Sequence, residues 1–170
     1  MKHSQLFIDS LINPKKLAAY RILSIGKVIQ YVFLLITLMT AFSLGQFFNS
    51  DADQIFAYEE IKEFASDLKW LVYMIAIIFL FIMNSLVLFA KISIYAYAGK
   101  ILLTPMKRRG EYRQVWRSAA FAITWEVILS IVLSLFPISS TVTLLLFIFI
   151  TMLVLIIALA NYPKALVTKT

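Results

Sequence analysis

One acidic residue lies within an otherwise apolar stretch, and chemistry would be expected there first. Glu126 follows Arg117 by nine residues, a rise of roughly 13 Å along a helix. A carboxyl group in hydrocarbon costs on the order of 3 kcal/mol, so such residues face the protein interior, are protonated or have a partner. Glu126 is therefore a candidate polar pin between helices, or a candidate site of proton or cation handling.

Polar side chains at a similar expected depth define a candidate layer around Glu126. Depths were counted along helices at about 1.5 Å per residue, and the layer consists of Glu126, Asn84, Ser85, Thr37 and Thr151. Burial favours the uncharged acid, which can donate a hydrogen bond to the Asn84 amide. Two interpretations stay open: a neutral pin that fixes helix register, and a group that titrates or pairs with a base of a partner protein.

The residue types needed for most other chemistry are scarce. The chain has no Cys and a single His, His3, which excludes a disulfide, a thiolate nucleophile and a Cys-based metal site. No G-x-S-x-G, H-E-x-x-H, Walker or dinucleotide-binding pattern occurs. We therefore expect no enzyme activity, no metal and no cofactor.

The composition indicates a membrane protein. Of 170 residues, 62% are hydrophobic and 15% are charged, whereas soluble domains are about half apolar and about a quarter charged. Crossing about 30 Å of hydrocarbon takes roughly 20 apolar residues as a helix. Four segments meet this requirement, at 28–48, 70–90, 119–136 and 142–160. They predict an all-α integral membrane protein with four transmembrane helices in a single domain, 1–170.

The basic residues predict the orientation. Segments 1–27, 91–118 and 161–170 hold fourteen of the sixteen Lys and Arg residues, and the segment 49–69 holds two basic and six acidic residues. Because Lys and Arg are retained on the cytoplasmic side, both termini and the basic connection 91–118 are expected there. The acidic loop 49–69 is expected outside a bacterial cytoplasmic membrane. Basic residues beside membrane anchors do not suggest nucleic acid as a partner.

Amphipathic segments are expected outside the four spans. Residues 4–12 predict an interfacial helix that Pro14 ends, followed by a second short helix over 15–25. Apolar and acidic residues alternate at helical spacing over 50–68, which favours a solvated, lid-like helix over a cation site. A cationic cluster is expected either to anchor the topology or to contact anionic lipid head groups or a partner; it comprises Lys107, Arg108, Arg109, Arg113 and Arg117.

Three stretches of the sequence carry a family likeness. They are 13–21 (NPKKLAAYR), 31–35 (YVFLL) and 112–117 (YRQVWR). They resemble small polytopic membrane proteins of Gram-positive bacteria classed as a domain of unknown function. Some members are labelled maltodextrin-utilisation proteins, and the family is distantly similar to Yip-type membrane proteins. The chain departs from that pattern in its shorter external segment and in Trp125 and Glu126, which replace an uncharged, Pro-containing turn. The resemblance implies no catalytic residues.

Two functions of different class follow from these observations. The first is a non-catalytic accessory or partner-binding component of a bacterial envelope or transport system, in contact with the lipid bilayer and with a membrane-protein partner or a second copy. The second is a small oligomeric transporter or channel that uses Glu126. A hydrated path to Glu126 would favour transport, whereas an apolar groove beside a dry polar layer would favour partner binding.

Overall fold

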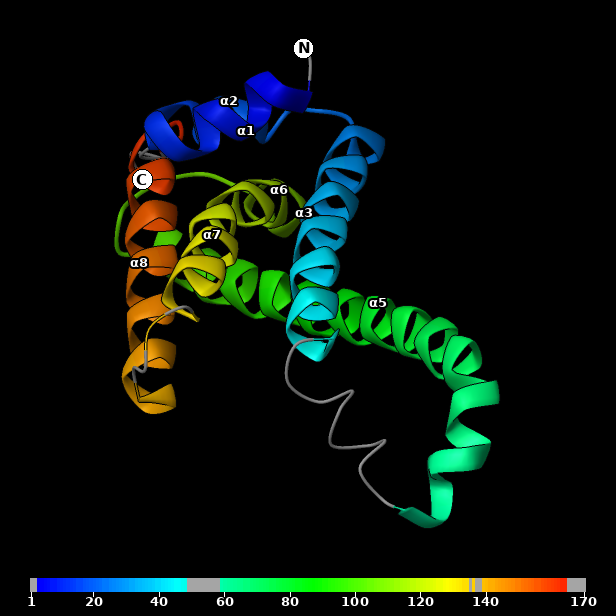
Figure 1. Ribbon diagram of the computed structural model, residues 1–170. Coiled ribbons are helices and arrows are strands. Elements are labelled where there is room, and N and C mark those ends of the chain that lie inside the picture. Colours follow the sequence, from blue (N-terminus) through cyan, green and yellow to red (C-terminus); the bar gives the residue numbers. More distant parts are fainter. Residues whose placement is uncertain (1–2, 49–58, 135, 137–138, 165–170) are drawn as a thin grey trace. The chain divides into compact units, whose positions relative to one another are not determined.

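In a computed structural model the chain is described over residues 3–48, 59–134, 136 and 139–164. The described residues form helices and connections without a strand, apart from one isolated bridge between Arg108 and Lys164 (Figure 1). Four helical segments are long and apolar enough to cross a membrane, namely Ile25–Gln46, Tyr73–Leu103, Tyr112–Leu133 and Thr141–Ala160. The expected all-α architecture with four candidate spans is thereby confirmed.

The helices follow one another along the chain with short connections. Their bounds are α1 (His3–Ile12), η1 (Pro14–Lys16), α2 (Leu17–Tyr20), α3 (Ile25–Gln46), α5 (Glu59–Leu103), α6 (Tyr112–Ala122), α7 (Thr124–Leu133) and α8 (Ser140–Ala160). The chain divides into two units, one of Met1–Val32 with Phe89–Thr170 and the other of Phe33–Leu88. The helices α3 and α5 each contribute to both units.

The segment 91–118, expected as a basic connection, is mostly helical. The helix α5 continues to Leu103, and α6 begins at Tyr112, so the connection is reduced to 104–111. The reason is an apolar face that persists past Lys91, with Ile92, Ala96 and Leu103 buried. The apolar residues of 92–103, with Pro105 to end the helix, predict this continuation of the helix over 70–90. The helix α6 begins seven residues before the expected start of the span 119–136.

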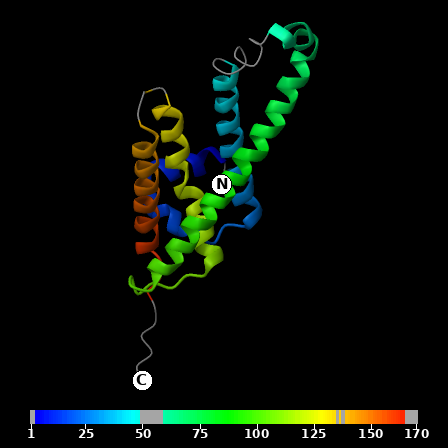
Figure 2. The same cartoon turned by 90° about the horizontal axis from the view of Figure 1, so that it is seen from below.

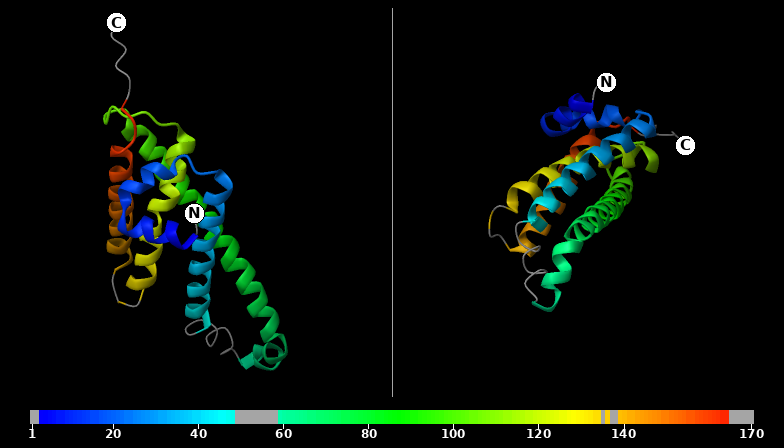
Figure 3. Two further views of the ribbon diagram at one scale, coloured as in Figure 1. Left: turned by 90° about the horizontal axis from the view of Figure 1, so that it is seen from above. Right: turned by 45° about the vertical axis from the view of Figure 1, so that its right-hand side comes forward.

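The N-terminal helix α1 is present as expected and packs against its own chain. It contacts α6 and α7, and Figure 3 shows α1 and α2 lying across these helices. Leu6, Asp9 and Ser10 are buried on the packed side, whereas Ile8 and Ile12 are 53% and 69% exposed. The outward face of α1 is therefore mixed, with the exposed Ser4 and Gln5 beside Ile8 and Ile12, as in a helix at the boundary between lipid and water.

The first unit is built around α6, α7 and α8. The helices α7 and α8 run side by side (Figure 2) and α6 contacts both. Small residues of α6, including Ser118, Ala119 and Ala120, are fully buried and allow close helix approach. A Cβ added at Gly99 of α5 would lie 2.9 Å from the Val115 side chain and 3.1 Å from that of Leu155.

The second unit pairs the far part of α3 with the first part of α5. The rings of Phe33 and Phe81 stack at 6.3 Å, and those of Phe48 and Tyr73 meet edge to face at 5.0 Å. The helix expected over 50–68 is present from Glu59 onward as the start of α5. Its residues 50–58 lie outside the described part of the chain.

Candidate functional site

Glu126 lies in an ion pair with a lysine from another helix. The Lys91 Nζ is 2.5 Å from Glu126 Oε1, and the Tyr95 hydroxyl donates to Oε2 at 2.9 Å. The Thr151 hydroxyl approaches the same oxygen at 3.4 Å. Three donors therefore converge on the Glu126 carboxyl group. The expected partner, the Asn84 amide, is not among them, because it donates to Thr40 instead.

Three helices supply this cluster because of simple helical spacing. Lys91 and Tyr95 are four residues apart on α5, so they project from one face. Glu126 lies in the first turn of α7, directly after α6 ends, and Thr151 lies at the middle of α8. Lys91 is twelve residues from the end of α5, a rise of about 18 Å. The cluster therefore lies near the middle of its candidate spans, beyond the reach of a lysine stem to either end.

The two charges differ in their surroundings. The side chain of Glu126 is 5% exposed, whereas that of Lys91 is 41% exposed. A buried carboxylate with three donors has its hydrogen-bonding capacity largely satisfied. The ammonium has one carboxylate oxygen as an acceptor and keeps an open side, which makes Lys91 the polar group that faces outward from the cluster.

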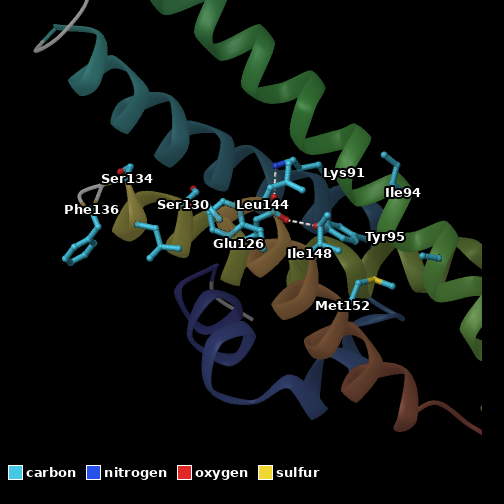
Figure 4. Close-up of a pocket in the computed structure, with 14 residues that line it drawn as sticks. Lys91, Ile94, Tyr95, Glu126, Ser130, Ser134, Phe136, Leu144, Ile148 and Met152 are labelled. Atoms are coloured by element: carbon cyan, nitrogen blue, oxygen red, sulfur yellow. Dashed lines mark hydrogen bonds and ion pairs between the residues drawn. The ribbon is translucent and has the colours of Figure 1, made fainter. Parts of the chain in front are cut away.

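A groove of about 750 Å³ opens beside the ion pair. Figure 4 shows Lys91 and Tyr95 of α5 at the same site as Glu126, with the small side chains of Ser130 and Ser134 along α7. The α8 wall is largely apolar, from Leu144, Phe147, Ile148 and Met152. The groove is thus mainly apolar and has one charged end, formed by Lys91 and Glu126.

Of the predicted polar layer, Thr151 contacts Glu126, and the remaining three residues belong to the second unit. There the Asn84 amide donates to Thr40 at 3.2 Å. Thr37 and Ser85 donate to backbone carbonyls one turn earlier on their own helices, those of Phe33 and Phe81. Counting residues along a helix gives the level of each of these side chains. It does not give the direction in which the side chain points, which decides its partner.

Sequence reasoning missed Lys91 and Tyr95, the two main partners of Glu126. The end of the expected span at residue 90 places Lys91 in the cytoplasmic connection, and therefore not among the candidates for an intramembrane pair. A usable signal was present, because Ile92, Ile94 and Ala96 continue the apolar character of the span beyond the lysine. A basic residue four positions before a tyrosine inside such a run indicates a helix face able to hold a buried acid.

The five cations predicted to contact lipid head groups or a partner fall into two groups: two bond to backbone carbonyls of the chain, and three are exposed. Arg108 and Arg117 donate to the backbone carbonyls of Tyr162 and Arg21 at 2.7 and 2.8 Å. Lys107 and Arg109 are exposed in the connection between α5 and α6, and Arg113 is exposed in the first turn of α6. Two of the five cations therefore also tie segments of the chain together.

The N-terminal segment is held by a second, smaller polar cluster. Asp9 accepts from Lys16 at 2.8 Å and from the Tyr20 hydroxyl at 2.6 Å. These bonds hold the pKa of the Asp9 carboxyl below its ordinary value, and burial together with Asp9 raises that of the Tyr20 phenol. Ser118 of α6 adds a bond to the Leu17 carbonyl at 3.0 Å. The segment 9–21 is thus fastened both to itself and to α6.

The groove beside Glu126 combines apolar walls with a few polar side chains. Within residues 3–48, 59–134, 136 and 139–164, no group of three His, Cys, Asp or Glu side chains is placed to hold a metal ion. The walls of the groove are mainly apolar, and its polar lining consists of Lys91, Tyr95, Glu126, Ser130, Ser134 and Thr143. Such a site can hold an elongated apolar ligand that places one polar or acidic group next to Lys91.

Fold and site together define an all-helical protein with four candidate membrane spans and a charged pair among them. Residues 46–159 match the family described as "Protein of unknown function (DUF1189)", and the chain belongs to this family. The matched region includes the stretch 112–117 on which the family likeness was based, and not the stretches 13–21 and 31–35. Searches of curated proteins and of solved structures found no match.

Proposed function

We propose that this chain is a non-catalytic, multi-pass protein that binds a transmembrane helix of a partner protein in the groove beside Lys91 and Glu126. It would act as an accessory component of an envelope or transport system in a bacterial cytoplasmic membrane, with both termini in the cytoplasm. The likeness to Gram-positive, maltodextrin-labelled and Yip-type proteins is consistent with this setting and remains a prediction.

The half-exposed ammonium of Lys91 carries this proposal. Its side chain is 41% exposed toward the groove, near the middle of the candidate span. Lipid tails offer no acceptor for an N–H group, and an unsatisfied polar group in hydrocarbon is costly. An occupant with a carboxylate, amide or hydroxyl at that depth would complete the coordination of Lys91.

The walls of the groove favour a helix as that occupant. Ala98, Ser130 and Ser134 are small, and small residues let helix backbones approach closely inside membranes. The apolar side chains of α8 can pack against the partner by dispersion. The expected partner is therefore a transmembrane helix that is mostly apolar and carries one polar or acidic residue level with Lys91.

Photo-crosslinking in living cells tests this proposal. A photoreactive amino acid is placed at Ile148, which lines the groove, or at Leu153, which is equally exposed on α8 but lies outside the groove; both are 44% exposed. We expect a discrete protein adduct from position 148 whose crosslink maps to a transmembrane helix with a polar residue, and none from position 153.

Lys91 variants connect the adduct to the charged end of the groove. Lys91→Met should reduce the yield from position 148 several-fold, and Lys91→Arg should retain it because the charge is kept. Equal adducts from positions 148 and 153, or adducts with lipid alone at both, would contradict the proposal. An adduct of twice the chain's mass would assign the groove to a second copy and overturn the partner assignment.

Transport through Glu126 is the second candidate, and the exposure of Lys91 is the observation in its favour. Water entering the groove would reach the ion pair directly. Proteoliposomes loaded with a pH-sensitive dye test this: a proton flux that is lost in Glu126→Gln would favour transport. No flux above that of empty liposomes would leave partner binding as the function.

A further inference from the structure

A second cavity, of about 460 Å³, lies where α6 begins. One side is apolar, formed by Ile25 and Ile29 of α3 and by Phe89 of α5. The other side is formed by Arg113, Trp116 and Arg117 of α6. The cavity is thus divided into an apolar half and a cationic, aromatic half, and it is separate from the groove at Glu126.

The cationic half follows from the spacing of residues on α6. Arg113 and Arg117 are four residues apart, as are Tyr112 and Trp116, so the two pairs form adjacent stripes on one helix face. Trp116 stacks on Phe89, with ring centroids 6.3 Å apart and planes inclined by 13°. This contact fixes the indole between the apolar half and the arginines.

The two arginines retain donors for a ligand. Arg117 is positioned by its bond from Nη1 to the Arg21 carbonyl, and its Nε has no hydrogen-bond partner among the described residues. Arg113 is exposed. No acid is among the described residues that line the cavity. Paired guanidinium groups match the oxygens of a phosphate in geometry and charge.

We propose that this cavity binds one anionic phospholipid, with its phosphate on Arg113 and Arg117 and part of an acyl chain against Ile25, Ile29 and Phe89. The division into halves carries this assignment, because a free phosphate would leave the apolar side unfilled. Trp and Tyr are the side chains that prefer the level of the lipid head groups, and Tyr112 and Trp116 lie on the same face of α6 as the two arginines. The site does not depend on the function proposed for the groove.

Quenching of Trp116 fluorescence by brominated lipid tests the proposal. Trp70 and Trp125 are replaced by Phe in the full chain, so that Trp116 alone reports. Vesicles of phosphatidylcholine then receive increasing fractions of phosphatidylglycerol with brominated acyl chains. We expect saturable quenching at a low mole fraction of the anionic lipid, and weaker, linear quenching when brominated phosphatidylcholine is used instead.

Charge-matched variants separate a defined site from a generally basic surface. The half-saturating lipid fraction should rise about fivefold in Arg113→Gln and about 25-fold in the double variant Arg113→Gln with Arg117→Gln. The variant Lys107→Gln with Arg109→Gln removes two charges outside the cavity and should change it less than about twofold. Arg113→Gln alone leaves the bond from Arg117 to Arg21 intact, so its effect is free of that structural loss.

Two results would overturn the assignment. Equal quenching by brominated phosphatidylcholine and phosphatidylglycerol would show that the cavity does not select an anion. Equal losses in the 113/117 and 107/109 double variants would show that the basic surface attracts anionic lipid without a site at α6.

Discussion

Lys91 and Glu126 illustrate why a buried ion pair is better evidence of specificity than of stability. Removing two charges from water costs several kcal/mol, and their attraction repays that cost only when the remaining hydrogen bonds are made. Glu126 has these bonds, from Tyr95 and Thr151. The pair therefore fixes how α5, α7 and α8 fit together. The effect of substituting one partner on the free energy of unfolding should then depend on whether the other partner is present.

A double-mutant cycle tests this at the residue scale. Lys91→Met and Glu126→Gln should each lower the free energy of unfolding in detergent by about 2 kcal/mol, less than for a fully buried pair because Lys91 is partly exposed. The double variant should recover part of the loss, giving a coupling of about 1 kcal/mol or more. Thermal unfolding measures each value.

The exposed Lys107→Met serves as the control for that cycle and should change the free energy of unfolding by less than about 0.5 kcal/mol. Strictly additive losses from the 91 and 126 variants would mean that the two charges do not stabilise one another. In that case the contact at 2.5 Å would contribute nothing measurable to the fold.

At the scale of elements, the four spans could be predicted and their ends could not. Apolar runs of about 20 residues locate helices because lipid leaves the backbone no alternative partner. Charged residues were then used to end the runs, and this failed at Lys91, whose charge is neutralised by an acid more than thirty residues away in sequence. The apolar residues after Lys91 indicate that the helix continues, but they do not identify an acid on another helix, so the partners of Glu126 escaped prediction.

Two glycines of the same type should respond oppositely to the same substitution. A Cβ at Gly99 would press on Val115 and Leu155, whereas a Cβ at Gly26 would meet nothing within 4 Å. Gly99→Ala should therefore cost about 1–2 kcal/mol through overpacking. Gly26→Ala should gain about 0.5 kcal/mol because alanine favours the helix.

Thermal unfolding of the two single variants in one detergent checks this pair. A loss at Gly99 and a gain at Gly26 would show that α5 lies tightly against α6 and α8. Equal effects of the two substitutions would contradict that packing.

At the scale of the whole molecule, the unequal distribution of charge predicts how the chain sits in its membrane. Fourteen basic residues lie in the segments expected inside and two in the one expected outside. Green fluorescent protein fused to either terminus should fluoresce, because it folds only in the cytoplasm. Fused within 50–58, it should remain dark.

Fluorescence from only one of the two terminal fusions would rule out an even number of crossings. Fluorescence from the internal fusion, with both terminal fusions dark, would invert the orientation and place the arginines of α6 on the outer surface. The site proposed for an anionic phospholipid would then lie in the outer leaflet.

The anchorage of the N-terminal segment on α6 has a consequence for biosynthesis. The bonds from Ser118 to Leu17 and from Arg117 to Arg21 join residues about a hundred positions apart. When the ribosome has made residues 3–21, their docking surface on α6 does not yet exist, because the two long hydrophobic helices α3 and α5 are made before α6. Residues 3–21 are therefore made well before the surface on which they dock. Until α6 is in place, Asp9 and Ser10 must be hydrated or covered by another protein.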